Sequence, residues 1–335
     1  MPRSGSRSAT CEAAPNIALV KYWGVRDEAR ALPYNSSLSV TLDRLRTRTR
    51  VTFDSGLAED RFVLNGEVVD GAPRHAVGEM LDRIRVESGE RDRAEVRSSN
   101  NFPTASGLAS SASGFAALAG AAAYAAGLAP TPQHLSQIAR FGSGSACRSI
   151  FGGFVEWRSG RRSDGRDCYA TPLFPEDHWP ELVDLVALVA DAPTKAVRSA
   201  RAMQLTVATS PEFSGRQREI PGRLARIRRA IGARDASALF PAIMEECDSF
   251  RRVCETTTPP LDYLTGTSRA ILAAVDEVNR GAGRPVAAYT HDAGAHVHVF
   301  LHASDVPRMR RRLAQVAGIA GTRVLHAGPG ARRVG

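Results

Sequence analysis

Two apolar runs in the last third of the chain are joined by a short turn that carries a carboxylate. The turn reads HDAGAH, and Asp292 comes two residues after Thr290, where the first apolar run ends. A carboxylate at this place can cap the turn through an Asx-type hydrogen bond. It can equally act on a substrate as a general base or as an orienting group. The spacing alone leaves both interpretations open.

Two cations occupy settings that favour an anionic partner. Arg148 closes the small-residue loop GSGSACRS, where a guanidinium can hold a carboxylate through two parallel hydrogen bonds, although a surface arginine would fit the same loop. Lys21 follows the buried-strand pattern NIALV, and a cation in an apolar context favours an anion over solvent. Ser143 and Ser145 precede Arg148 and can donate hydrogen bonds to phosphate oxygens.

The stretch NFPTASGLASSAS, residues 101–113, has the features of a phosphate-binding loop. Pro103 and Gly107 interrupt regular structure, and the Ala-rich run that follows predicts a buried helix beginning near Ser110. Unpaired backbone N–H groups and the positive end of the helix dipole meet there, beside several serine hydroxyls. We expect a nucleoside triphosphate at this helix start. A packing helix with serine caps is the alternative, because the Walker spacing and its lysine are absent.

A carboxylate, an arginine, a lysine and a phosphate loop together fit phosphoryl transfer to an acid substrate. Positioning and charge stabilisation supply most of the catalysis in such a site. The histidines His291, His296 and His298 also raise the possibility of a zinc site, and the last two would share one strand face. The absence of a Cys or a second carboxylate close by in the sequence disfavours zinc.

The elements that must position these residues differ between the two halves. The pattern of the first part predicts strands over 16–22, 38–42, 47–53, 91–98 and 150–157, a hairpin over 61–69 with the turn at Asn65-Gly66, and helices over 74–87, 108–127 and 132–140. The pattern of the second part predicts strands over 182–189, 284–290, 297–301 and 322–325, and helices over 197–210, 220–231, 236–254, 266–279 and 306–316.

This order of elements predicts a split α+β sandwich with antiparallel pairing. A domain boundary should not cut a strand, so we place it near Pro180, between a domain of residues 1–180 and a domain of residues 181–335.

Composition excludes several classes of protein. A chain of 335 residues with 43% hydrophobic residues is typical of a soluble globular protein with a substantial core. The net charge of +9 comes mostly from arginine, and clusters such as Arg226, Arg228 and Arg229 lack the interleaved aromatic side chains of a nucleic-acid surface. The run over 108–127 is too rich in Ala, Gly and Ser for a membrane span, and the N-terminus lacks the apolar core of a secretory signal. Five scattered cysteines without a CxxC pair are typical of reduced thiols in a cytoplasm.

Motifs spread over nearly the whole chain carry a resemblance to a known family. They are NIALVKYWG at 16–24, LPYNSSLSVTLD at 32–43, NFPTASGLASSASG at 101–114, GSGSACRSIFGGFVEW at 142–157, MQLTVATS at 203–210 and YTHDAGAH at 289–296. In this order they closely resemble the mevalonate diphosphate decarboxylases of the GHMP kinase superfamily. Several of these motifs are too long to be explained by chance.

The resemblance implies a fold and a reaction. The fold is a two-domain α+β GHMP-kinase fold, with an N-terminal domain like ribosomal protein S5 domain 2, a ferredoxin-like C-terminal domain and the active site in the cleft between them. In the implied reaction ATP, with Mg²⁺, phosphorylates the tertiary 3-hydroxyl of (R)-mevalonate 5-diphosphate, phosphate departs, and CO2 is lost to leave isopentenyl diphosphate. The resemblance further implies a homodimer in the mevalonate pathway of isoprenoid biosynthesis. From the composition we expect a cytoplasmic location and neither nucleic acid nor membrane as a partner.

The resemblance also implies roles for single residues. By position, Asp292 resembles the aspartate that orients or deprotonates the 3-hydroxyl, Arg148 the arginine that grips the substrate carboxylate, and Lys21 the active-site lysine beside it. Substrate contacts are implied at Asn16, Tyr22, Ser143, Ser145, Arg148, Ser199 and Met203. Contacts with ATP are implied at Pro103, Ser106, Gly107, Leu108, Ala109, Ser110, Ser111 and Ser113. No magnesium ligand is assigned.

Two departures from the family pattern leave the substrate open. Family members usually read KYWGK, with a second lysine that helps to bind the diphosphate, and Val25 stands in its place. The usual DAGPN is replaced by DAGAH from Asp292 on. One missing charge-assisted contact can change substrate preference by ~1–3 kcal/mol. A decarboxylase of mevalonate 5-monophosphate, giving isopentenyl phosphate, is therefore an alternative, unless Arg26 substitutes for the lysine.

A GHMP kinase that phosphorylates without decarboxylating is a weaker alternative, because it leaves Arg148 and Lys21 unexplained. A catalytically inactive binding protein that senses a metabolite or a nucleic acid is another, and the intact Asp292 argues against it.

Overall fold

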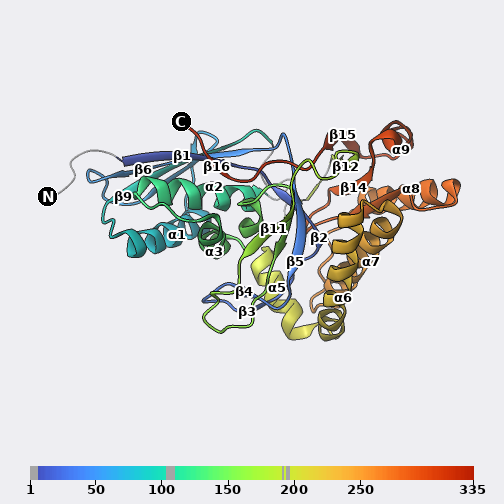
Figure 1. Ribbon diagram of the computed structural model, residues 1–335, viewed down its shortest axis with the longest axis horizontal. Coiled ribbons are helices and arrows are strands. Elements are labelled where there is room, and N and C mark those ends of the chain that lie inside the picture. The colour runs from blue at the N-terminus through green and yellow to red at the C-terminus, as the bar shows by residue number, and fades with distance from the viewer. Residues whose placement is uncertain (1–6, 103–109, 191, 194–196) are drawn as a thin grey trace.

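The computed structural model describes residues 7–102, 110–190, 192–193 and 197–335 (Figure 1). The two halves of the chain lie side by side along the longest axis. The N-terminal sheet is at the left of the view and the C-terminal helices are at the right. Each half combines β-sheet with helices packed against it, and most neighbouring strands are antiparallel. The predicted α+β organisation is confirmed.

The first sheet has the strand order β16, β1, β6, β9, β7, β8. In that order the bounds are Arg332–Arg333, Arg7–Ala13, Thr47–Asp54, Arg93–Asn100, Arg61–Leu64 and Glu67–Val68. The turn between β7 and β8 places Asn65 at a φ of 52° and Gly66 at a φ of 92°. Both values lie in the left-handed region that an Asn-Gly hairpin turn requires, so the predicted hairpin is confirmed.

Helices of the first half accompany this sheet. They are α1 (Ala72–Ser88), α2 (Ser110–Ala125), α3 (Pro132–Gly142) and α4 (Ala146–Ser149). The Ala-rich α2 packs directly on β1 and β6. A Cβ atom at Gly120 would lie 2.9 Å from the Sγ atom of Cys11, so a glycine is needed for this approach. The small side chains of α2 therefore bring the start of this helix close to the sheet.

The second sheet has the order β11 (Ala170–Phe174), β10 (Phe154–Trp157), β5 (Ser37–Thr41) and β2 (Asn16–Val20). A two-stranded ribbon, β3 (Val25–Asp27) with β4 (Leu32–Pro33), follows β2. Although β2 is an edge strand, all of its residues are buried, because helices of the second half cover it. Lys21, which comes directly after β2, consequently lies where the two halves meet.

The third sheet belongs to the second half and has the antiparallel order β13 (Ala287–Thr290), β14 (Val297–His302), β12 (Leu182–Val189) and β15 (Ile319–Leu325). Its helices are α5 (Ser199–Thr209), α6 (Phe213–Ala233), α7 (Ala236–Glu255), α8 (Gly266–Ala282), the short 3-10 helix η1 (Ala303–Asp305) and α9 (Val306–Leu313). One face of the sheet packs against α8 and α9. The other face shares a core with α6, α7 and the second sheet, which joins the halves.

Several elements differ from the sequence prediction. The strands β1 and β11 and the helix α4 were not predicted, and β10 begins at Phe154 rather than at residue 150. The reason is local: Gly153 has a φ of 70°, and a Cβ atom there would lie 2.3 Å from the Phe174 carbonyl oxygen, so the chain turns before β10 starts. At the other end of the chain, β16 pairs with β1 and returns to the first sheet. The division at residue 180 stays a prediction.

The cysteines form no disulfide among the described residues, and arginines of the charged clusters pair with glutamates. All five cysteines are buried and free. Within the Arg-rich helices, Arg226 donates to Glu245 at 2.6 Å and Arg312 donates to Glu277 at 2.5 Å. None of the helices in the described ranges combines the length and apolar character that crossing a bilayer requires.

Candidate active site

Lys21 and Asp292 form an ion pair across the junction of the two halves. The Nζ atom of Lys21 donates to Oδ1 of Asp292 at 2.8 Å. Lys21 is positioned by the end of β2, and Asp292 by the turn between β13 and β14. The Lys21 side chain is 3% exposed whereas that of Asp292 is 32% exposed. The carboxylate is therefore the member of the pair that a substrate can reach.

The surroundings of Asp292 keep its carboxyl group ionised. Burial by itself raises the pKa of this carboxyl, but the charge and hydrogen bond of Lys21, with smaller contributions from His298 and Arg148, bring the net pKa below its usual value. The carboxylate bonds to Lys21, and the turn is closed by a backbone bond from the Gly294 N–H to the Asp292 carbonyl. This arrangement favours the functional interpretation of Asp292 over the Asx-turn interpretation.

His291 lies next to this pair without taking part in it. Its Nδ1 atom is 2.8 Å from the Asp292 carbonyl oxygen, and the ring is buried. Burial lowers the pKa of His291 to about 4, against a smaller opposing effect of its contact with Asp292. The imidazole is therefore neutral at pH 7, with Nδ1–H as the donor to the carbonyl.

Arg148 is held by neutral groups. Its Nε atom donates to Ser39 Oγ at 2.9 Å, its Nη1 atom donates to Ser37 Oγ at 2.6 Å, and its Nη2 atom donates to Asn16 Oδ1 at 3.1 Å. No ion pair of Arg148 occurs within the part of the chain that the structure describes. Burial lowers the pKa of Arg148, opposed in part by the charge of Asp292, but a guanidinium remains protonated. Its positive charge is thus not neutralised by a carboxylate of the described residues, although the side chain itself is almost completely buried.

The substrate-binding residues predicted near Arg148 lie together. The amide of Asn16 donates to the Ser145 carbonyl at 3.0 Å and to Ser149 Oγ at 2.8 Å, which ties β2 to α4. Ser143 and Ser145 have their Oγ atoms 3.2 Å apart. Ser111, in the first turn of α2, has its Oγ atom 3.5 Å from that of Ser143. The start of α2 and the loop before α4 therefore meet.

Tyr22 packs against this loop. Its ring meets Trp157 edge-on, with 4.8 Å between ring centroids, and burial raises the pKa of its hydroxyl. A Cβ atom at Gly144 would lie 2.5 Å from the ring of Tyr22, so the glycine of the GSGS loop lets the ring come close.

The two predicted contacts on α5 occupy different settings. Met203 is buried in a cluster that also contains Trp23 and Ala293. The indole N–H of Trp23 donates to Thr206 Oγ1 at 3.0 Å and fixes α5 against the end of β2. Ser199 is the first residue of α5 and is only partly exposed.

Part of the predicted phosphate loop lies outside the described residues, namely Pro103, Ser106, Gly107, Leu108 and Ala109. Ser110 begins α2, as predicted, and its first turn contains no acidic side chain, which suits an anion. The Ser113 hydroxyl is fully buried and lies 2.6 Å from Thr47 Oγ1, because this face of α2 packs on β6. This side chain anchors the helix to the sheet, and the contact of Ser113 with ATP stays a prediction.

The histidines have structural partners. His296 Nδ1 accepts the Val189 N–H at 3.1 Å, and His298 Nδ1 lies 2.6 Å from an Asp184 carboxylate oxygen. Burial lowers the pKa of His296 to about 4. Within the described ranges, no group of three or more His, Cys, Asp or Glu side chains is arranged to hold a metal ion.

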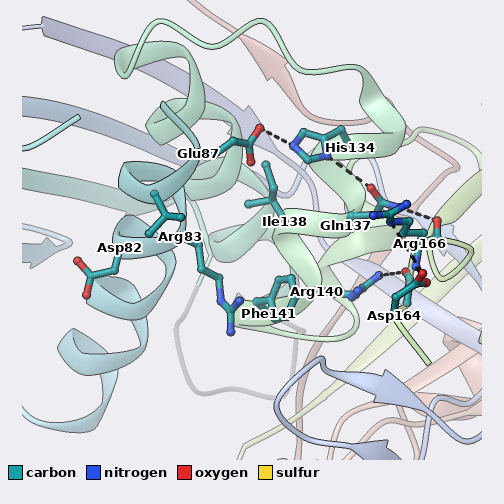
Figure 2. A pocket seen from close by; sticks show the side chains of 12 residues that line it. Asp82, Arg83, Glu87, His134, Gln137, Ile138, Arg140, Phe141, Asp164 and Arg166 are labelled. Atoms are coloured by element: carbon teal, nitrogen blue, oxygen red, sulfur yellow. Dashed lines mark hydrogen bonds and ion pairs between the residues drawn. The ribbon is translucent and has the colours of Figure 1, made fainter. Parts of the chain in front are cut away.

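A pocket of about 520 Å³ lies away from these residues, between α1 and α3 (Figure 2). Ile138 and Phe141 contribute its apolar surface, and Arg83 stacks over the Phe141 ring at 3.7 Å. Its lining contains none of the predicted catalytic residues, so the pocket is separate from the candidate site.

Two family models match the chain, one in each half. The diphosphomevalonate decarboxylase-like N-terminal domain matches residues 13–170, and the mevalonate 5-diphosphate decarboxylase C-terminal domain matches residues 185–326. The diphosphomevalonate decarboxylase of Gibberella zeae is 45% identical over 312 residues, which are 89% of this chain and 81% of that protein. This chain belongs to the diphosphomevalonate decarboxylase family. The enzyme of Bos taurus is likewise 45% identical, over 87% of this chain and 76% of its own.

Solved structures of diphosphomevalonate decarboxylases share the fold. The enzyme of Staphylococcus aureus superposes with a TM-score of 0.92 at 35% identity and covers 99% of both chains. A structure described as a complex with MVAPP, AMPPCP and magnesium superposes with a TM-score of 0.91 at 37% identity and covers 98% of this chain and 99% of that one. The predicted two-domain GHMP-kinase fold is confirmed.

Val25 and its neighbour Arg26 stand where the family pattern has a second lysine close to the candidate site. Val25 packs against the apolar cluster around Trp23. The guanidinium of Arg26 donates to the Pro33 carbonyl at 3.2 Å and to the Ser159 carbonyl at 3.3 Å. Nε and Nη2 of Arg26 thus bond to backbone carbonyls, and the substitution of Arg26 for the lysine stays a prediction.

Sequence reasoning missed three residues around the decarboxylase site. Ser37 and Ser39 hold Arg148, and their two-residue spacing on a buried strand could have indicated a shared face. Glu246 accepts the Lys21 N–H at 2.9 Å and is fully buried. Glu246 stands next to Cys247 and three residues from Ile243, on the apolar face of α7, and this position could have indicated that its carboxylate is buried.

Proposed function

We propose that this chain catalyses the ATP-dependent decarboxylation of (R)-mevalonate 5-diphosphate to isopentenyl diphosphate, with ADP, phosphate and CO2 as the other products. One observation carries the proposal: an ionised, substrate-accessible Asp292 lies near a buried Arg148 that has neutral partners. The two charges are close enough to influence each other's pKa. A hydroxy acid can therefore present its hydroxyl to one group and its carboxylate to the other.

Asp292 acts on the 3-hydroxyl. Its carboxylate accepts the hydroxyl proton or orients the hydroxyl for phosphorylation. Lys21 Nζ, 2.8 Å from the carboxylate, keeps it ionised and fixes its direction. The 3-hydroxyl must be converted into a phosphate ester because hydroxide is a poor leaving group.

Arg148 acts on the substrate carboxylate. Its guanidinium holds the carboxylate so that the C1–C2 bond lies beside the carbon that loses phosphate. When the C3–O bond breaks, its electron pair leaves with the phosphate. The electrons of the C1–C2 bond then form the C2–C3 double bond, and CO2 is released. A fixed guanidinium with neutral partners suits this step, because it needs little reorganisation.

The start of α2 supports ATP binding. Its backbone N–H groups, the hydroxyls of Ser110 and Ser111 and the absence of acidic side chains in the first turn suit phosphate oxygens. We extend the proposal to contacts from Pro103, Ser106, Gly107, Leu108 and Ala109. Magnesium bound with the nucleotide would supply positive charge to the transferring phosphoryl group, held mainly through phosphates and water.

The remaining expectations are part of the proposal. Asn16, Tyr22, Ser143, Ser145, Ser199 and Met203 bind the phosphorylated mevalonate. The domains comprise residues 1–180 and 181–335, and the enzyme is a cytoplasmic homodimer without a nucleic-acid or membrane partner.

Decarboxylation of mevalonate 5-monophosphate is a second candidate, favoured by Val25. A lysine at this place would add a charge-assisted contact to the distal phosphate. Val25→Lys should therefore raise the ratio of kcat/KM for diphosphate over monophosphate by about tenfold or more. Val25→Met, of similar length but uncharged, is the control. An unchanged ratio would clear Val25 of this role.

The proposal is tested by supplying ATP with each mevalonate phosphate and measuring ADP, phosphate and CO2 separately. Equal amounts of the three products are expected with mevalonate 5-diphosphate. ADP without CO2 would leave a kinase and rule out the decarboxylase. Asp292→Asn should nearly abolish turnover while ATP binding changes by only a few-fold, since the carboxylate acts on the hydroxyl.

A further inference from the structure

The main chain of Lys21 is held on both sides by side chains. On one side its N–H donates to Oε1 of Glu246 at 2.9 Å. On the other side its carbonyl accepts from Nδ2 of Asn35 at 2.9 Å. Because β2 is the edge of its sheet, no strand is present to take the outer N–H just beyond it, and a buried carboxylate does so instead.

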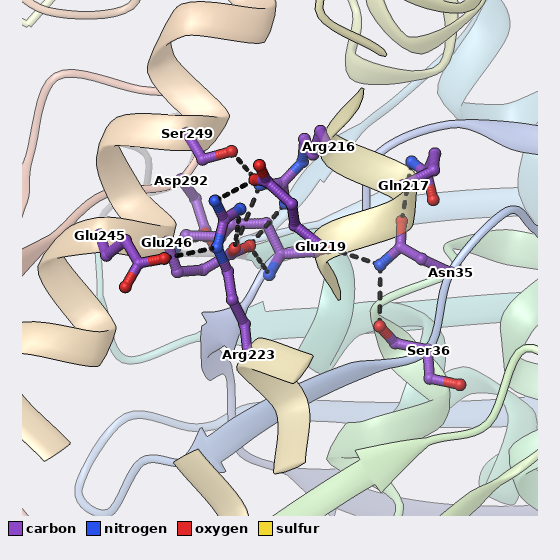
Figure 3. Close-up of polar contacts among 11 residues, drawn as sticks. Asn35, Ser36, Arg216, Gln217, Glu219, Arg223, Glu245, Glu246, Ser249 and Asp292 are labelled. Carbon is purple, nitrogen blue, oxygen red and sulfur yellow. Dashed lines mark hydrogen bonds and ion pairs between the residues drawn. The ribbon is translucent and has the colours of Figure 1, made fainter. Parts of the chain in front are cut away.

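Glu246 is unusual for a helix residue because it is fully buried and charged. Arg216 donates to both of its carboxylate oxygens, and Arg223 Nη1 donates to Oε2 at 3.3 Å (Figure 3). Both arginines come from α6 and are almost completely buried. Two guanidiniums stabilise the ionised carboxylate, which is what a charge removed from water requires.

Asn35 is held from the same helix. Gln217, the residue after Arg216, donates from Nε2 to Oδ1 of Asn35 at 3.4 Å (Figure 3). The Nδ2 atom of Asn35 also donates to the Ser36 carbonyl at 2.8 Å. Consecutive residues of α6 thus fix the two groups that hold the Lys21 peptide units.

These contacts join the two halves of the chain at the reacting pair. Lys21 and Asn35 belong to the first half, while Glu246 and Arg216 belong to the second. The helix that carries Glu246 also packs on β13, and Asp292 follows β13 by two residues. The contact between Glu246 and Lys21 therefore sets where β2 ends relative to the turn that carries Asp292.

We infer that Glu246 and Asn35 are positioning residues, which aim the Lys21 side chain at Asp292 by fixing the Lys21 main chain from both sides. This inference rests on the proposed function of the Lys21–Asp292 pair. Neither residue contacts the reacting atoms. Their effect on turnover passes through Lys21, since a small displacement of a catalytic group is costly in rate.

Glu246→Gln tests the inference, because it keeps the shape but replaces one acceptor oxygen by an NH2 group, which must then face an N–H donor of Lys21 or of the arginines. We expect kcat to fall by about tenfold to 100-fold, with KM for ATP and for mevalonate diphosphate changed by less than about threefold. A rise in either KM with kcat unchanged would overturn the inference.

Glu90→Gln is the matched control. Glu90 is also a buried carboxylate; it accepts the Arg91 N–H at 2.8 Å and the Asp92 N–H at 3.0 Å, and it pairs with Arg7. Its partner Arg7 is the first residue of β1, which belongs to the sheet at the left of Figure 1. This variant should lower the thermal midpoint as Glu246→Gln does, while kcat stays within about twofold of the native value.

A double-mutant cycle separates positioning from general loss of structure. In a Lys21→Met background, Glu246→Gln should lower the residual kcat by less than about twofold, because the group it positions is gone. An equal fractional loss in both backgrounds would overturn the inference. If native enzyme releases no CO2 from mevalonate diphosphate, the proposed function fails instead, which is a distinguishable result.

Asn35→Asp provides a second route should Glu246→Gln not fold. It is isosteric but replaces the N–H donor by an oxygen facing the Lys21 carbonyl. The same pattern is expected: lower kcat, nearly constant KM, and no further loss in the Lys21→Met background. A native kcat in folded Asn35→Asp would contradict the role of Asn35.

Discussion

Arg148 and Arg216 are buried to the same extent, with 2% of each residue exposed, yet their partners are opposite in kind. Arg148 donates to two serine hydroxyls and an amide oxygen. Arg216 donates to both oxygens of the Glu246 carboxylate. A carboxylate neutralises the charge of Arg216, whereas hydroxyls leave the charge of Arg148 in place. Under the proposed function, this difference separates an arginine that stabilises the fold from one that binds the substrate carboxylate.

Neutral partners alone do not mark a binding residue, as Arg140 demonstrates. It is also buried, and its donors end on the backbone carbonyls of Arg30, Gly165 and Cys168. These bonds tie loops of the first half together. Arg148 differs because Asp292 lies near enough for each group to influence the other's pKa.

The largest expected effect is on turnover in Arg148→Gln. Removing a fixed charge that stabilises the reacting carboxylate should lower kcat/KM for CO2 release by about 10²–10³-fold. Its partners are hydroxyls and an amide, so the free energy of unfolding should fall by only about 1–2 kcal/mol. Steady-state CO2 release and denaturant unfolding measure the two quantities. Near-native kcat/KM would remove Arg148 from the mechanism.

Arg216→Met should lower the free energy of unfolding more than Arg148→Gln does. It leaves the buried Glu246 with one fewer counter-charge, and breaking such a pair costs about 3–5 kcal/mol in the free energy of unfolding. Denaturant unfolding of the two arginine variants under the same conditions is the measurement. If Arg216→Met costs no more stability than Arg148→Gln, the distinction between the two arginines is wrong.

A smaller effect is expected from Ser37→Ala, which removes one hydroxyl from the Arg148 guanidinium. Losing this hydrogen bond should lower kcat/KM by about fivefold, equivalent to about 1 kcal/mol. Ser136→Ala is the control, because this buried hydroxyl accepts the Ala170 N–H at 2.9 Å, outside the site. Equal kinetic losses in both serine variants would mean that Ser37 has no special connection with Arg148.

The smallest effect concerns pH. Lys21 is the main factor that lowers the pKa of Asp292, which burial alone would raise. Native activity that depends on the ionised carboxylate is therefore lost only as pH falls through this lowered pKa, below the ordinary range of aspartate. In Lys21→Met the acid limb of the residual kcat profile should move to higher pH. An acid limb at the same pH in both proteins would show that Lys21 does not control Asp292.

The local sequence pattern is sufficient to predict the site residues that directly follow a strand. Asp292 and Lys21 each follow an apolar run, so residue type and place in the sequence are enough to indicate chemistry. The GSGS loop before Arg148 is equally recognisable. The pairing of Lys21 with Asp292 was not predicted, because 271 positions separate the two residues and the resemblance places Lys21 only beside Arg148.

The parts that could not be predicted depend on contacts between distant segments. Nothing in the sequence around Glu246 indicates that it meets the main chain of Lys21, 225 positions away. The resemblance implies that Ser113 contacts ATP, but nothing in the local sequence indicates that its hydroxyl lies 2.6 Å from Thr47 Oγ1. The strand β16 could not be predicted because its two arginines have no apolar pattern. It forms a strand because it pairs with β1, which is distant in the sequence.

A crystal structure of this protein with mevalonate 5-diphosphate bound tests the central claim most directly. The account predicts one substrate molecule whose carboxylate contacts the Arg148 guanidinium and whose 3-hydroxyl lies within hydrogen-bond distance of Asp292, on the side facing the start of α2. A substrate that places its diphosphate on Arg148, or that reaches only one of these two residues, would contradict it.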